Sequence, residues 1–113
     1  TSAFTALLTS DIGNNAAHML VGANGPAATS IHADILKVPY PAVDGPDGDS
    51  LTKKTVPRIA IVQPGIKNTA SAPSKDMIKQ LASSTTAAIF DTAQDGTVVI
   101  YESGGKLQIS KGK

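Results

Sequence analysis

At the centre of the chain stands Arg58-Ile59-Ala60-Ile61-Val62, in which four apolar, mostly β-branched residues follow Pro57-Arg58 and precede the break at Pro64-Gly65. A short apolar run between chain-breaking residues predicts a buried strand. Two comparable runs precede it and three follow it along the chain. They cover residues 4–9, 31–38, 87–91, 97–102 and 106–110. The sequence therefore predicts six short strands.

Helices are expected between some of these strands. Asn14-Asn15 can cap a short helix over residues 16–21, and Ser74 is a good N-cap for a helix over residues 75–82. Residues 40–49 are rich in Gly and Pro, which predicts a loop without regular structure, followed by one helical turn at residues 50–55.

The predicted order is β-α-β-loop-β-α-β-β-β, which indicates a layered α/β or α+β fold that ends in a β-meander. Turn signals at Gln94-Asp95-Gly96 and Gly104-Gly105 separate the last three strands. Residues 1–113 are expected to form a single domain or part of one.

Composition restricts the function classes. The net charge is +1 and charged residues make up 17% of the chain, below the usual share of about 25%. A module that tracks phosphates normally shows a clear basic excess, whereas here Lys106, Lys111 and Lys113 indicate no more than a solvated tail. The chain has no cysteine, which excludes disulfides, thiolate zinc sites and cysteine nucleophiles. No apolar run approaches the length of a membrane span.

Few residues are candidates for chemistry. His18 and His32 lie in different predicted elements, which argues against a shared metal site. Asp44 belongs to an acidic, glycine-rich loop without the spacing of a calcium loop, so a solvated turn is expected there. Asp11 directly follows the first strand, where α/β proteins place functional groups, and it is equally suited to capping the next segment.

Four segments together resemble ComEC-type metallo-β-lactamase domains, the domains of bacterial DNA-uptake (competence) proteins. Phe4-Thr5-Ala6-Leu7-Leu8-Thr9-Ser10-Asp11-Ile12 is similar to the family's F-L-L-T-G-D-I, and Ala33-Asp34-Ile35-Leu36-Lys37-Val38-Pro39 to its A-D-V-L-K-V-P. Pro57-Arg58-Ile59-Ala60-Ile61-Val62 is similar to P-K-I-A-V-I, and residues 88–100 to the closing Y-R-T-D-x-D-G-x-I. The resemblance implies the C-terminal half of an αββα sandwich with a mixed sheet.

The resemblance also implies a damaged metal site. Asp11 matches the family's metal-bridging aspartate, but the first histidine of H-H-G-S falls at Tyr40 and the histidine of Y-G-H-P at Ala72. The H-x-H-x-D-H cluster has no counterpart in this sequence. A catalytic zinc needs about three protein ligands, so no catalytic residue and no cofactor is expected in this chain. Zinc or manganese would bind only if other ligands came from elsewhere; Lys37, Tyr40 and Asp44 form a candidate site loop.

Three functions remain open at this level. The first is a degenerate, non-catalytic domain of a competence-type protein, located outside the cytoplasm by family resemblance and in weak contact with DNA. The second is part of a metal-dependent, phosphodiesterase-like hydrolase whose main ligands lie in a missing N-terminal half. The third is a protein-interaction module, because half of a sandwich exposes an apolar sheet face that attracts its missing half or a second copy.

Overall fold

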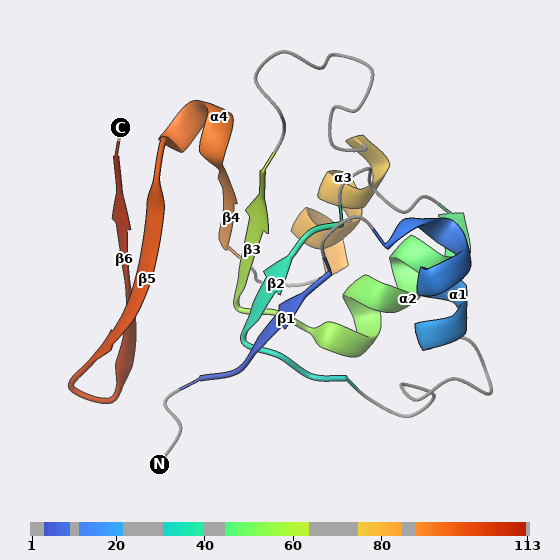
Figure 1. The fold of residues 1–113 in the computed structure, drawn as a ribbon, viewed down its shortest axis with the longest axis horizontal. Helices are drawn as coiled ribbons and strands as arrows, with labels where there is room; N and C mark the ends of the chain where they lie inside the picture. The colour runs from blue at the N-terminus through green and yellow to red at the C-terminus, as the bar shows by residue number, and fades with distance from the viewer. Residues whose placement is uncertain are drawn as a thin grey trace.

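A computed structural model describes residues 4–9, 12–21, 31–39, 45–63, 75–84 and 88–112 of the 113-residue chain. Figure 1 shows a central sheet with helices beside it and a separate hairpin at the C-terminal end. Within the described residues, no helix is both long and apolar enough to cross a membrane.

The central sheet has four parallel strands in the sequential order β1-β2-β3-β4. Short apolar runs form them, as the sequence predicts for buried parallel strands. Cα partners run straight across the sheet, so Leu7 lies beside Leu36, Leu36 beside Ala60, and Ala60 beside Ile89. The strands are β1 (Ala6–Leu8), β2 (Ile35–Lys37), β3 (Ile59–Val62) and β4 (Ala88–Asp91).

Three helices connect these strands and lie together on one side of the sheet (Figure 1). They are α1 (Gly13–Val21), α2 (Gly45–Thr55) and α3 (Lys75–Ser84). Each connection moves to the next strand in the same direction, and right-handed crossovers then place every helix on the same face. The core lies between the helices and this face, and it consists of Val21, Leu36, Val38, Leu51, Ala60, Val62 and Leu81.

The prediction of a loop without regular structure is wrong for residues 45–49, which belong to helix α2, while residues 40–44 lie outside the described residues. The helix begins at Gly45, five residues before the single turn expected at residues 50–55. Proline is tolerated in the first turn of a helix, where its missing N–H has no partner to lose, so Pro46 is compatible with this start. Lys53 and Lys54 in the last turn of α2 also interact favourably with the helix dipole. The Gly and Pro residues therefore mark a helix start.

The end of the chain differs from the predicted meander. The strand β4 pairs in parallel with β3, and a short helix, α4 (Thr92–Asp95), follows it. Among the described residues, β5 (Val98–Ser103) and β6 (Lys106–Lys111) alone form an antiparallel pair, which is a separate two-stranded sheet. Gly104 and Gly105 both take positive φ angles in the turn between them, as a tight hairpin requires. The hairpin is confirmed; the three-stranded meander is wrong.

The second face of the parallel sheet carries no helix in the described part of the chain (Figure 1). Because side chains alternate along a strand, the row formed by Leu8, Lys37, Ile61 and Phe90 points away from the helix-covered core. Leu8 is 75% exposed, and the other three are half-buried. We call these four residues the open row.

Candidate functional site

The carboxyl-terminal edge of the sheet is the candidate site. The strands β1, β2 and β3 are adjacent and parallel, so Thr9, Pro39 and Gln63 all lie where the chain leaves the sheet at one edge. Open parallel sheets commonly bind ligands at this edge. Three of the four segments that carry the family resemblance therefore end at the same edge.

Most of the predicted site residues lie outside the described residues. These are Asp11, Tyr40, Asp44 and Ala72, and the metal-site predictions made for them remain predictions. Asp11 comes two positions after Thr9 in the sequence, and Tyr40 directly follows Pro39. A carboxylate, Asp11, therefore belongs to the segment that follows β1, and a phenol, Tyr40, to the segment that follows β2.

The described part of the edge is held by local hydrogen bonds. Thr9 is buried, and its hydroxyl donates a hydrogen bond to the carbonyl oxygen of Lys37 on the neighbouring strand. The amide of Ile12 donates to the carbonyl of Thr9 at 3.2 Å, and that of Val38 donates to the carbonyl of Ile61 at 2.9 Å. Satisfied backbone groups fix where β1 and β2 end, so the segments after them leave from defined points.

Lys37 is the one predicted site residue among those described. Its side chain belongs to the open row, and its ammonium group donates to the carbonyl of Val38 at 3.3 Å. Partial burial lowers the pKa of Lys37 below its ordinary value, because desolvation penalises the charged form. The aliphatic stem thus covers the sheet face while the charge reaches the carboxyl-terminal edge, where it can attract an anionic group.

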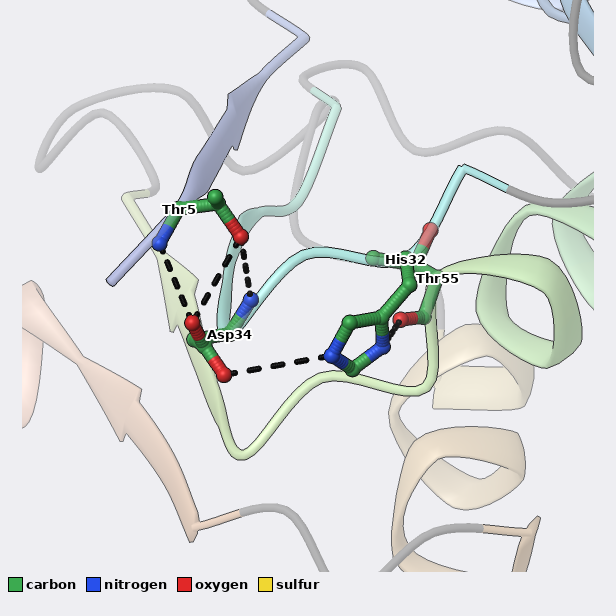
Figure 2. A network of polar contacts seen from close by, with 4 residues as sticks. All are labelled: Thr5, His32, Asp34 and Thr55. Carbon is green, nitrogen blue, oxygen red and sulfur yellow. Dashed lines mark hydrogen bonds and ion pairs between the residues drawn. The ribbon is translucent and has the colours of Figure 1, made fainter. Parts of the chain in front are cut away.

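A second polar cluster lies at the opposite end of the sheet, where the strands begin (Figure 2). A carboxylate oxygen of Asp34 accepts hydrogen bonds from the amide of Thr5 at 3.0 Å and from its hydroxyl at 3.5 Å. The amide of Asp34 is 3.3 Å from the same hydroxyl oxygen. Two residues 29 positions apart are thereby joined, which ties the start of β1 to the start of β2.

His32 completes this cluster and links it to α2. Its Nδ1 is 3.0 Å from the carbonyl oxygen of Thr55, so Nδ1 carries the proton and donates. Its Nε2 lies 3.9 Å from the carboxylate of Asp34 (Figure 2). The same carbonyl of Thr55 accepts from the amide of Ala33 at 3.2 Å. Both imidazole nitrogens face protein oxygens, and the cluster satisfies the last carbonyl of α2, which indicates a structural role.

His18 is exposed and lies in α1, whereas His32 precedes β2. The two histidines therefore belong to different parts of the fold, as predicted. Across the described ranges, no three His, Cys, Asp or Glu side chains gather in a way that could hold a metal ion. The expected ligand positions are not among those residues, so this finding leaves the metal prediction open.

A third cluster follows β4 and was missed by sequence reasoning, which assigned residues 94–96 to a turn. Asp91 caps α4 by accepting from the amide of Ala93 at 2.8 Å. The carboxylate of Asp95 accepts from the amide of Asp91 at 3.0 Å and pairs with Lys111 at 3.1 Å. The hydrogen bond from Asp91, followed by the contact with Lys111, lowers the pKa of Asp95. The ammonium of Lys111 also lies 5.8 Å from the ring centre of Phe90.

This cluster attaches the hairpin to the sheet. Lys111 comes from β6, Asp95 from α4 and Phe90 from β4, and the amide of Gly112 donates to the carbonyl of Thr97 at 2.8 Å. The carboxylates are therefore used within the fold. The sequence signal for this cluster was Asp91, a favourable N-cap residue, whereas Lys111 is distant in the sequence and could not be assigned to it.

No family model matches the chain, and neither a curated protein nor a solved structure matches it.

Proposed function

We propose that this chain is a non-catalytic, metallo-β-lactamase-like domain of the kind found in DNA-uptake proteins, and that it functions by binding. The observation that carries the proposal is the one-sided sheet. The helices α1, α2 and α3 cover one face, and the open row lies on the other (Figure 1). Each layer of an αββα sandwich also has helices on one face of its sheet. Here the other face is open at Leu8, whereas Ile35 and Ile59 on the same face are buried.

The arrangement of the four similar segments supports the same proposal. Three of them form β1, β2 and β3, which are neighbours in the sheet and end at one edge. The fourth contributes β4 and β5. Neighbouring parallel strands share a carboxyl-terminal edge, and this edge is where a metal site on such a sheet would be placed.

The side chains at the family-matched metal positions argue against hydrolysis by this chain. Of the three family-matched positions, Asp11 keeps a carboxylate, while Tyr40 and Ala72 replace histidines. Alanine offers no side-chain donor, and a phenol is a poor substitute for imidazole in a zinc site. One carboxylate cannot hold a catalytic zinc and generate the bound hydroxide that hydrolysis needs.

The proposed role is therefore structural recognition within a larger DNA-handling assembly located outside the cytoplasm. A net charge of +1 provides little attraction for phosphates, so contact with DNA would be weak and would depend on a partner. The open row offers an apolar surface, with one ammonium from Lys37, for a second sheet layer. Such a layer is supplied by the other half of the same domain type.

Restoring the site tests both the resemblance and the loss of the metal. The double substitution Tyr40→His with Ala72→His returns imidazoles to two family-matched positions and leaves the Asp11 carboxylate in place. Three ligands are enough for a zinc site. We expect calorimetry to detect one-to-one zinc binding by the double variant.

The matched control adds Asp11→Ala to the same background and should abolish that binding. If the double variant binds no zinc although its circular dichroism matches that of the parent chain, the positions have been matched wrongly and the family proposal fails. If the unmodified chain itself binds zinc through Asp11, the hydrolase interpretation replaces the proposed one.

A further inference from the structure

The hairpin of β5 and β6 lies on the side of the parallel sheet opposite the three helices (Figure 1). One of its two faces is apolar and half-buried, and we call it the inner face; it consists of Val98, Ile100, Leu107 and Ile109. Lys111 lies directly opposite Val98 in the pairing, so its side chain leaves from the inner face. Its ammonium lies 5.8 Å from the ring centre of Phe90, which belongs to the open row. The inner face is therefore turned toward the second face of the sheet.

The hairpin is held in this position by accessible contacts. Lys111 pairs with Asp95 at 3.1 Å, and the two side chains are 43% and 23% exposed. Ion pairs so open to water contribute little to stability. The side chains of the inner face are half-buried rather than buried. Within the described residues, none of them belongs to the hydrophobic cluster that joins the helices to the sheet.

Gly96 provides a hinge between α4 and the hairpin. Its φ angle is 74° and its ψ angle is −151°, a conformation that essentially glycine alone adopts. Hinges are commonly a few such residues at the ends of elements, where they absorb changes in backbone angles. After Gly96, the amide of Gly112 donates to the carbonyl of Thr97 at 2.8 Å and closes the base of the hairpin. The hairpin can therefore turn about Gly96 as one unit.

We propose that the hairpin is a hinged flap over the second face of the parallel sheet, and that the contacts of Lys111 with Asp95 and Phe90 are the latch that keeps it closed. Opening turns the chain at Gly96 and moves the inner face away from the sheet, while the hydrogen bonds between β5 and β6 stay intact. Because the latch is an exposed ion pair with one aromatic contact, the closed and open forms differ little in free energy and both are populated.

Opening uncovers part of the open row, because Phe90 is half-buried beside Lys111 when the flap is closed. The flap thereby controls when a partner reaches the second face. This consequence rests on the proposed function, in which that face binds a second layer, whereas the opening itself does not. A distance between the hairpin and the helices therefore tests the flap even if no second layer binds.

Double electron–electron resonance on the 113-residue chain measures the opening. The chain has no cysteine, so Gln108→Cys on the outer face of β6 and Lys53→Cys in α2 carry the only two spin labels. Both positions are exposed. We expect a major distance from the closed form and a minor one from the open form. Lys111→Gln should increase the minor population about fivefold, and Asp95→Asn should change it in the same direction.

The matched control is Lys106→Gln, which removes a lysine from the tip of the same hairpin, away from the latch, and should leave both populations unchanged. Sodium chloride at about 1 M screens exposed charges. It should therefore increase the minor population in the parent chain but not in Lys111→Gln. An effect of Lys106→Gln as large as that of Lys111→Gln would contradict the latch.

A two-stranded hairpin is only marginally stable on its own, so opening has to be distinguished from melting. Amide hydrogen exchange makes the distinction, because opening leaves the cross-strand hydrogen bonds of β5 and β6 in place. We expect their protection to be the same in the parent and in Lys111→Gln. Loss of this protection in the variant, or a single distance that neither Lys111→Gln nor salt changes, would overturn the proposal.

Discussion

Val56 is the residue whose replacement should stabilise the fold most clearly. It directly follows α2 and has a φ angle of 46°, the left-handed conformation that β-branched residues rarely adopt. Its amide donates to the carbonyl of Thr52 at 3.0 Å, which closes the helix end in the way that glycine usually does. Its side chain is 52% exposed, so little packing depends on it. The substitution Val56→Gly should remove backbone strain at small cost.

The magnitude follows from two opposing terms. A left-handed conformation costs an L-residue roughly 1–2 kcal/mol, and glycine avoids this cost. Glycine also has greater conformational freedom in the unfolded chain, which lowers the free energy of unfolding by about 0.4–1 kcal/mol. We therefore expect Val56→Gly to raise the free energy of unfolding by about 0.5–1 kcal/mol, and the melting temperature by a few degrees.

Urea denaturation followed by circular dichroism measures this difference. Val56→Ala is the matched control, because it removes the exposed side chain but keeps the Cβ atom that causes the strain; it should stay within about 0.5 kcal/mol of the parent. If Val56→Gly lowers the stability by about as much as glycine does at an ordinary exposed site, then Val56 is not strained and the structure of this helix end is wrong.

The other two stability predictions concern carboxylates. Asp34→Ala removes the acceptor for the amide and hydroxyl of Thr5, so it should lower the free energy of unfolding in urea by about 1 kcal/mol. Asp34→Asn keeps one acceptor oxygen and should lower it less. Equal losses for the two variants would contradict the hydrogen bonds between Thr5 and Asp34. Asp95 has a lowered pKa, so its contribution is complete above the unfolded-state value and is lost as the pH falls through the folded-state value. The urea midpoints of the parent and Asp95→Asn should therefore differ more at about pH 7 than at about pH 2.5, and a difference that does not depend on pH would count against the pairing with Lys111.

The strands and two of the helices could be predicted from the sequence because their signals are local. Residues 59–62 are apolar and mostly β-branched, they lie between Pro57 and Pro64, and they form β3. The expected helix over residues 75–82 is α3, extended by two residues at its end. The helix α1 begins three residues before the expected residue 16, so the asparagines expected to cap it lie within the helix. Local composition locates an element better than it locates its ends.

Strand pairing could not be predicted in the same way. The sequence shows that β4 is a strand, but not that its partner is β3, because paired residues such as Val62 and Asp91 lie 29 positions apart in the sequence. A nearby turn signal favoured pairing with β5 instead. The competing short helix α4 is stabilised by Asp91 and by the contact of Asp95 with Lys111, and the second of these is long-range. Side-chain contacts of this kind decide the topology but leave no local pattern.

The candidate site, like the fold, could be predicted from the sequence only where its signals are local. The place of Asp11 after a strand could be seen in the sequence, whereas Tyr40 was selected through the family resemblance. The parallel pairing of β1 and β2 shows that the segments after both strands begin at one edge. The Thr5–Asp34–His32 cluster was not predicted, because it depends on partners 29 positions apart and on the carbonyl of Thr55 at the end of an unexpected helix. The roles of Asp11, Tyr40 and Ala72 remain predictions.

The proposal that this domain is a non-catalytic binding domain without a working metal site is best tested by calorimetric titration of the unmodified chain with zinc and with manganese. Asp11→Ala serves as the control. The account predicts no heat of binding for either metal and identical traces for the two proteins, because one carboxylate does not make a catalytic metal site. Tight binding by the unmodified chain that disappears in Asp11→Ala would contradict it and would show that this edge of the sheet still holds a working metal centre.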